Sequence, residues 1–178
     1  LLQLFNERFI TGEKPCKITP INEKFIAING YLEAINESIF EQHPLALLEV
    51  FLLLQLNPEL LGIRATTIRL IRNNLHLIDD EFRANKTANR LFIEIFRRPR
   101  GLTHELRRMN RYGLLAAYLP SFANIVARMQ YDLFHIYTVD EHTLFVIRNL
   151  RRFSLEEHAT EFPLCNTVFN LIPKPEIL

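Results

Sequence analysis

Four basic side chains in the middle of the chain follow the spacing of one helical face. His104, Arg107, Arg108 and Arg111 occupy positions i, i+3, i+4 and i+7, so a helix places them on the same side. Guanidinium groups arranged in this way can bind phosphate or an acidic protein surface. The alternative is a solvated face that pairs with acidic residues of neighbouring helices. We predict that Arg107, Arg108 and Arg111 contact a partner or phosphate.

The charge around this stripe does not favour nucleic acid as the partner. The segment from Arg90 to Arg111 carries seven arginines against two glutamates, but the whole chain has a net charge of only +1. Nucleic-acid surfaces usually interleave basic residues with aromatic ones for base stacking. Tyr112 is the only aromatic residue beside the stripe. Arg148, Arg151 and Arg152 form a second, smaller basic group in the sequence.

His142 is the one residue that we predict as a metal ligand. It follows Thr138, Asp140 and Glu141, whose spacing is that of a helix-capping box. A neutral imidazole in the first turn of that helix could bind a divalent ion. The two acidic residues are equally explained by helix capping and by the helix dipole. Nearby His135 is interpreted as a core or hydrogen-bonded histidine.

The sequence offers no complete catalytic constellation. It contains no Walker-type glycine loop, no nucleophile elbow, no His-Asp dipeptide and no Gly-Ser followed by an Asp-x-Asp pair. We therefore expect the chain to be a fragment of a larger protein and to be inactive by itself. The apolar start and the end around Pro173, neither of which has a cap or closing element, favour the same interpretation.

The elements that must position these residues are mainly helical. Glycine is scarce, with 5 residues, and 48% of the chain is hydrophobic. Apolar residues recur at helical spacing from Pro44 to Leu56, from Thr67 to Leu77, and from Asp79 onward to Arg98. Ser154 has the spacing of another helix start. We predict an all-α bundle of about seven to nine helices, with one short β-hairpin near residues 25–35 at Asn29-Gly30.

Localisation follows from two further observations. Pro44 to Leu56 is too short and too often interrupted by polar residues to span a membrane. Cys16 and Cys165 are too few and too far apart for a disulfide framework, so both are expected to be buried thiols in a reducing compartment. We expect a cytoplasmic protein with no membrane contact.

Two long segments carry a resemblance to a known family. Residues 96–122 read FRRPRGLTHELRRMNRYGLLAAYLPSF, and residues 129–153 read MQYDLFHIYTVDEHTLFVIRNLRRF. With LLQLF at the start, TTIRLIR at 66–72 and EFPLC at 161–165, the chain resembles the bifunctional uridylyltransferase/uridylyl-removing enzymes of the PII signalling protein. Residues 11–60 match only loosely.

The resemblance implies a domain organisation and a function. Residues 1–128 would form the helical middle domain, with 1–20 as the tail of a preceding nucleotidyltransferase domain. Residues 129–178 would be the opening helices of a truncated HD-type phosphohydrolase domain, in which His142 matches the first metal-binding histidine. The parent enzyme would use UTP to uridylylate PII, and would hydrolyse UMP from it in response to glutamine. UTP and glutamine would bind domains outside this chain.

A divalent metal, Mg²⁺, would serve both reactions in the full enzyme, and we expect none to bind the fragment. The chain itself would be a structural coupling region between the two catalytic sites. The alternative is a stand-alone helical protein-interaction adaptor. A His-Asp dipeptide within the next stretch of reading frame would favour the enzyme over the adaptor.

Overall fold

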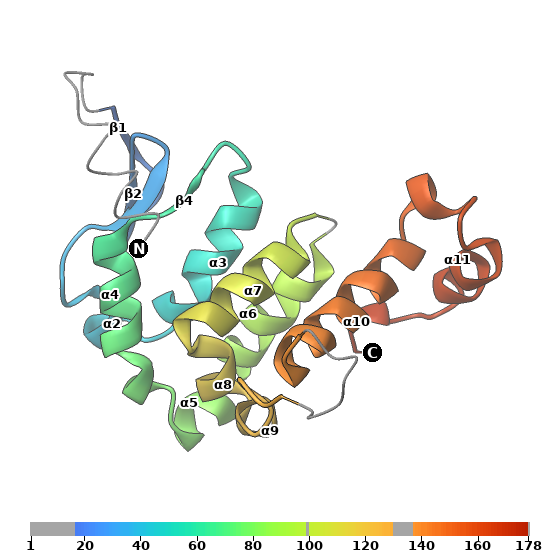
Figure 1. The fold of residues 1–178 in the computed structure, drawn as a ribbon. Coiled ribbons are helices and arrows are strands. Elements are labelled where there is room, and N and C mark those ends of the chain that lie inside the picture. Colours follow the sequence, from blue (N-terminus) through green and yellow to red (C-terminus); the bar gives the residue numbers. More distant parts are fainter. Residues whose placement is uncertain (1–16, 99, 130–136, 178) are drawn as a thin grey trace.

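The computed structural model describes residues 17–98, 100–129 and 137–177 (Figure 1). These residues contain ten α-helices and one small four-stranded sheet. The predicted mostly helical fold with a short hairpin is confirmed. The apolar start of the chain, Cys16 and His135 lie outside the described residues.

The sheet is built around the predicted hairpin. Its strands, in the spatial order β1-β2-β3-β4, are Ile18–Pro20, Phe25–Ile28, Tyr31–Ala34 and Gly62–Ile63. β2 and β3 pair antiparallel across a two-residue turn, in which Asn29 has φ 51° and Gly30 has φ 82°. Positive φ at both positions defines a type I′ turn, which explains the Asn-Gly pair. β1 adds antiparallel and β4 adds parallel, and both are too short to show a strand pattern in the sequence.

The helices follow the sheet in a short-linked series. In chain order from α2 to α11 they are Ile39–Gln42, Ala46–Leu56, Ala65–Asn73, Asp80–Ala84, Lys86–Arg97, Leu102–Tyr112, Leu114–Tyr118, Pro120–Ala123, Val139–Phe153 and Pro163–Asn170. Figure 1 shows α3, α6 and α7 in the middle, the sheet and α4 on one side, and α10 and α11 on the other.

Two predicted boundaries are wrong for local hydrogen-bonding reasons. The stretch expected to run on from Asp79 breaks at Asn85, whose Oδ1 accepts the backbone N–H groups of Thr87 and Ala88 and so starts α6. Ser154 ends α10 instead of starting a helix. Its hydroxyl donates to the carbonyl oxygen of Arg151 at 2.7 Å, and only a short 3₁₀ turn follows.

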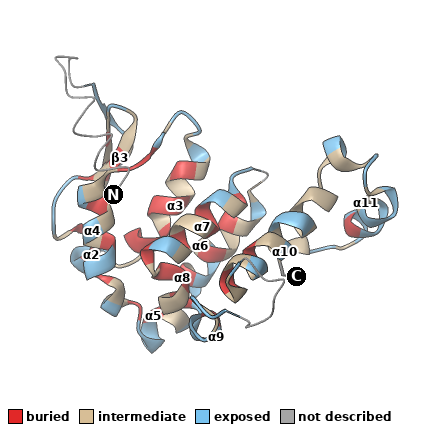
Figure 2. Ribbon diagram, viewed as in Figure 1, coloured by how far each residue is buried: buried red, intermediate tan, exposed pale blue. Residues whose placement is uncertain are grey.

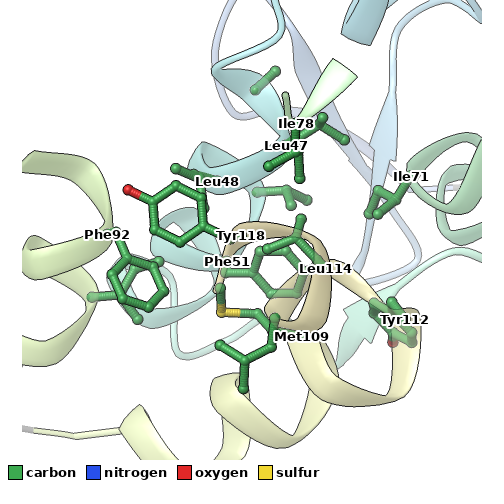
Figure 3. Packing of buried hydrophobic residues seen from close by; sticks show 14 of the residues in the cluster. Leu47, Leu48, Phe51, Ile71, Ile78, Phe92, Met109, Tyr112, Leu114 and Tyr118 are labelled. Atoms are coloured by element: carbon green, nitrogen blue, oxygen red, sulfur yellow. The ribbon is translucent and has the colours of Figure 1, made fainter. Parts of the chain in front are cut away.

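Helix α3 lies at the centre of the hydrophobic core. Leu47, Leu48, Val50 and Phe51 are each 0% exposed, so the helix is covered on nearly every side, as expected for a helix that is apolar all round. Figure 2 shows the buried residues gathered in this part of the molecule, and Figure 3 shows side chains from several helices around Phe51. The ring of Phe51 lies 6.2 Å from that of Tyr112 on α7.

Polar contacts fix the sheet to the helices around this core. Thr67 on α4 accepts the buried backbone N–H of Ala34 at 3.0 Å. Arg64 pairs with Glu33 on β3 at 2.7 Å. Lys24, just before β2, pairs with Glu49 on α3 at 2.8 Å. These contacts place the hairpin in one orientation against α3 and α4.

Cys165 is exposed, so the expectation of a buried thiol is wrong at this position. Helix α11 packs only one side against the rest of the molecule and buries only Phe169.

Within the described ranges, no helix combines the length and the apolar character that crossing a membrane requires.

We predict that Phe51→Ala strongly destabilises the fold. The side chain is completely buried, so its removal leaves a cavity and should lower the free energy of unfolding by about 3–5 kcal/mol. Urea unfolding followed by circular dichroism measures this change. Val146→Ala, at a position that is 57% exposed, is the control and should change stability by less than about 0.5 kcal/mol. Equal urea midpoints for the Phe51→Ala and Val146→Ala variants would contradict the burial of Phe51 in the core.

Candidate functional site

Helix α7 carries the whole predicted basic stripe and directs it away from the core. Gly101 and Gly113 bound the helix in left-handed conformations, with φ 83° and φ 87°. Leu106 and Met109 are buried on the inner face. The stripe therefore faces outward, as the helical spacing predicted.

The structure brings the three predicted arginines to one hollow. Arg107, Arg108 and Arg111 line a depression of about 330 Å³ with Tyr31 of β3 and Leu61. The hollow thus joins the end of the hairpin to the outer face of α7. Its size and its guanidinium groups suit a phosphate group or an acidic side chain of a partner.

The three arginines are not equally available to a ligand. Arg108 pairs with buried Glu105 at 2.7 Å, and its side chain is only 16% exposed. Arg107 lies 3.7 Å from Glu141 of α10, and its guanidinium carbon lies 5.0 Å from the centre of the Phe145 ring. Arg111 is exposed and pairs with no acidic residue in the described part of the chain. The alternative of a face paired with acidic residues of neighbouring helices thus describes Arg107, whereas Arg108 pairs within α7 itself, and Arg111 remains the most accessible of the three.

The stripe alters the titration of its neighbours. Burial, followed by the positive charges of Arg108, Arg111 and Arg107, lowers the pKa of His104. Burial also raises the pKa of Glu105 to about 7, and the charge and hydrogen bond of Arg108 offset only part of that rise. Glu105 Oε2 is buried and has no hydrogen-bond partner among the residues that the structure describes. With a pKa of about 7, the buried carboxyl group of Glu105 changes its charge near neutral pH.

His142 lies in the first turn of α10, as predicted, and is exposed. Its ring centre lies 6.1 Å from that of Tyr137, and the two rings meet edge to face. The part of the chain that the structure describes holds no group of three or more His, Cys, Asp or Glu residues close enough to bind a metal ion. These residues therefore offer one imidazole, and the role of His142 as a ligand stays a prediction.

Asp140 serves the structure of the helix start. It is 5% exposed, and it accepts hydrogen bonds from Asn110 Nδ2 at 2.7 Å and from the backbone N–H of Ala127 at 3.2 Å. Burial alone would raise the pKa of Asp140, but hydrogen bonds from Thr138, Asn110 and Ala127 hold it below its ordinary value. Asp140 therefore joins α10 to α7 rather than facing solvent.

Sequence reasoning missed Asn110, because an asparagine on a polar helix face gives no signal of a distant partner. It also missed that Arg100 lies with Arg148, Arg151 and Arg152 at a second hollow. That grouping depends on how α7 meets α10, which no local pattern encodes.

Comparison with known proteins gives the class to which this fold and surface correspond. The family profile described as "Uridylyltransferase GlnD third domain" matches residues 25–118. That range runs from the start of β2 to the end of α8 and covers more than half of the chain.

Several proteins with assigned names are similar in sequence to this chain over its entire length. The chain is 60% identical to a bifunctional uridylyltransferase/uridylyl-removing enzyme of Nitrosococcus oceani over 178 residues, which is 100% of this chain and 20% of that protein. It is 63% identical to the enzyme of the same name from Methylococcus capsulatus, and 51% identical to that from Hydrogenovibrio crunogenus, with the same coverage. No solved structure matches significantly. The chain belongs to the family of bifunctional uridylyltransferase/uridylyl-removing enzymes, and it spans about a fifth of the length of these relatives.

We predict that Glu105 makes the fold less stable as pH rises. Its pKa in the folded chain, about 7, lies above its ordinary value of 4.5. Between these values the folded state holds a proton that the unfolded state has lost, so the free energy of unfolding falls as pH increases. The loss approaches about 3 kcal/mol above pH 7. Urea unfolding from pH 4.5 to pH 8 measures it.

Glu105→Gln keeps a hydrogen-bond acceptor for Arg108 and should remove this fall. Glu59→Gln is the control at an exposed position and should behave like the unaltered chain. The same pH dependence in the Glu105→Gln variant and the unaltered chain would rule out Glu105 as its source.

Proposed function

We propose that this chain is the coupling region of an enzyme that uridylylates the PII signalling protein with UTP and later removes UMP by hydrolysis, in response to glutamine. The names of its relatives support the transfer and removal of uridylyl groups in this proposal. Residues 1–128 would form the helical middle domain, with residues 1–20 ending the preceding nucleotidyltransferase domain. Residues 129–178 would begin the HD-type hydrolase domain. The full enzyme would act in the cytoplasm.

The observation that carries the coupling role is the junction between α7 and α10. Asn110 donates to buried Asp140 at 2.7 Å, and Arg107 reaches Glu141 at 3.7 Å. These two contacts hold the start of α10, and therefore His142, against the helix that bears the basic stripe. Helix α7 lies within the matched third domain, and α10 lies beyond it. The junction between them would therefore hold the start of the hydrolase domain in a fixed position relative to the helical middle domain, and through it relative to the nucleotidyltransferase domain.

The chain's own part in the hydrolase site would be a single ligand. A divalent metal, Mg²⁺ in this proposal, would neutralise phosphate charge and activate water in the full enzyme. The exposed imidazole of His142 would hold one coordination position, and the remaining ligands would come from residues outside the described part. The isolated chain would therefore release no UMP from uridylylated PII.

His142→Ala in the full enzyme should lower uridylyl-removing activity by about a hundredfold or more and leave uridylyl transfer within about twofold. Loss of one metal ligand commonly abolishes metal binding at a site of few ligands. Initial rates of both reactions, together with the metal content of the purified protein, measure the effect.

His43→Ala is the matched control, because His43 is an exposed histidine at the end of α2, and it should change neither rate. Unchanged UMP release and unchanged metal content in the His142→Ala enzyme would remove the basis for assigning His142 as a ligand.

Arg111→Glu in the full enzyme should weaken PII binding by about five- to tenfold, mainly through slower association, because an accessible charge at the edge of an interface steers encounter. Surface plasmon resonance at two salt concentrations separates the association rate from the dissociation rate. Arg72→Glu makes the same charge change at an exposed position on α4 and should leave binding unchanged. Equal affinities for the two variants would exclude the stripe as the PII contact.

A further inference from the structure

A second basic hollow lies where the start of α7 meets the C-terminal half of α10. It has a volume of about 320 Å³ and is lined by Arg100, Arg148, Arg151 and Arg152. Among the described residues that line it, none is acidic. Four guanidinium groups around one depression repel one another, so an anion in the hollow would remove an unfavourable interaction.

In the part of the chain that the structure describes, the neighbouring arginines are paired with acidic residues, unlike Arg100 and Arg148 of this group. Arg98 pairs with Glu94 at 2.8 Å, and Arg97 pairs with Glu176 at 2.9 Å. In contrast, within the described ranges Arg100 and Arg148 lie near no carboxylate that could pair with them. Acidic residues are thus present close by in the fold, but they neutralise other arginines.

Two of the arginines are held in position without using all of their donors. Arg151 donates from Nη2 to the carbonyl oxygen of Arg98 at 2.6 Å, while its buried Nε has no hydrogen-bond partner within the described ranges. The guanidinium carbon of Arg148 lies 4.9 Å from the centre of the Phe145 ring. Packing over a ring leaves the N–H groups at the edge of the guanidinium free for an anion. Such preorganisation reduces the entropy lost on binding.

The fourth arginine is already paired. Arg152 lies 2.5 Å from Glu161, whose side chain is 48% exposed. An exposed pair of this kind contributes little to stability, so a ligand phosphate can share or replace Glu161. The hollow therefore contains four arginines that a ligand could contact. Two of them have no paired carboxylate in the described ranges, Arg151 is held in position by the backbone, and Arg152 has a partner that a ligand could replace.

The start of α7 adds to this positive potential. The residue before the helix is Gly101, and no side chain caps the first turn, of which Leu102 and Thr103 line the hollow. The partial positive charge at a helix start favours anions. This contribution is secondary to the four arginines, which come from two different helices and their flanks.

We propose that this hollow binds a compact, multiply charged phosphate compound. A volume of about 320 Å³ lies at the lower end of the range for small-molecule sites, and several arginines can each bind a separate phosphate oxygen. A diphosphate or triphosphate group should therefore bind more tightly than a single phosphate. The inference rests on this hollow alone and does not depend on the proposed coupling function.

Isothermal titration calorimetry of the 178-residue chain with inorganic phosphate, pyrophosphate and ATP tests the proposal at constant ionic strength. Pyrophosphate should bind with saturation at one site and more tightly than phosphate. ATP tests whether the phosphate group is part of a nucleotide: much tighter binding of ATP than of pyrophosphate would support a nucleotide, and equal binding would support a free polyphosphate.

Arg100→Gln and Arg148→Gln should each weaken pyrophosphate binding by about tenfold. Arg72→Gln is the matched control and should bind like the unaltered chain, and circular dichroism verifies that every variant folds. Absence of saturable pyrophosphate binding would overturn the proposal. Equal affinity in the Arg100→Gln, Arg148→Gln and Arg72→Gln variants would do so as well.

Discussion

The burial of α3 is the constraint on which the rest of the structure depends. A helix with Leu47, Leu48 and Phe51 at 0% exposure cannot be stable in water until other elements cover it. Helices α6, α7 and α2 pack against it, and the pair of Lys24 with Glu49 joins it to the hairpin (Figure 1). Each of these elements has one polar face and therefore turns that face outward. The position of the basic stripe follows from this, because α7 must place Leu106 and Met109 against the core.

The attachment of α10 depends on a different kind of interaction. This helix buries Leu144, but its other contacts with α7 include the hydrogen bond of Asp140 with Asn110. A buried carboxylate is destabilising unless it is satisfied, so Asp140 favours the arrangement in which Asn110 and the backbone of Ala127 reach it. Apolar contact alone would allow α10 to slide along α7. The polar pair selects one register and so determines which arginines of the two helices meet.

The sequence predicted what depends on local pattern and missed what depends on tertiary contact. The Asn29-Gly30 turn and the apolar helix ending near Leu56 have short-range causes. The helix start at Thr138 was predicted from its spacing, but among the described residues its side chain makes no capping hydrogen bond. β4 has only two residues, and it exists because it pairs with β3. Ser154 met the rule for a helix start, but its hydroxyl bonds backwards to Arg151 instead. The shared helical face of Arg107, Arg108 and Arg111 could be predicted, and the pair of Arg108 with Glu105 follows from the same i,i+3 spacing. The contact of Arg107 with Glu141 depends on the position of α10 and could not be predicted.

Two acidic contacts lie beside the closely spaced basic groups of α7. Arg107, Arg108 and Arg111 lie within about one turn of each other, and their mutual repulsion opposes formation of the helix. Glu105 offsets part of it from within the helix, and Glu141 offsets part from α10. His104 lines both basic hollows, and a protonated imidazole there would increase the repulsion in each. Burial, together with the positive charges of Arg108, Arg111 and Arg107, lowers the pKa of His104, so this added repulsion is reduced.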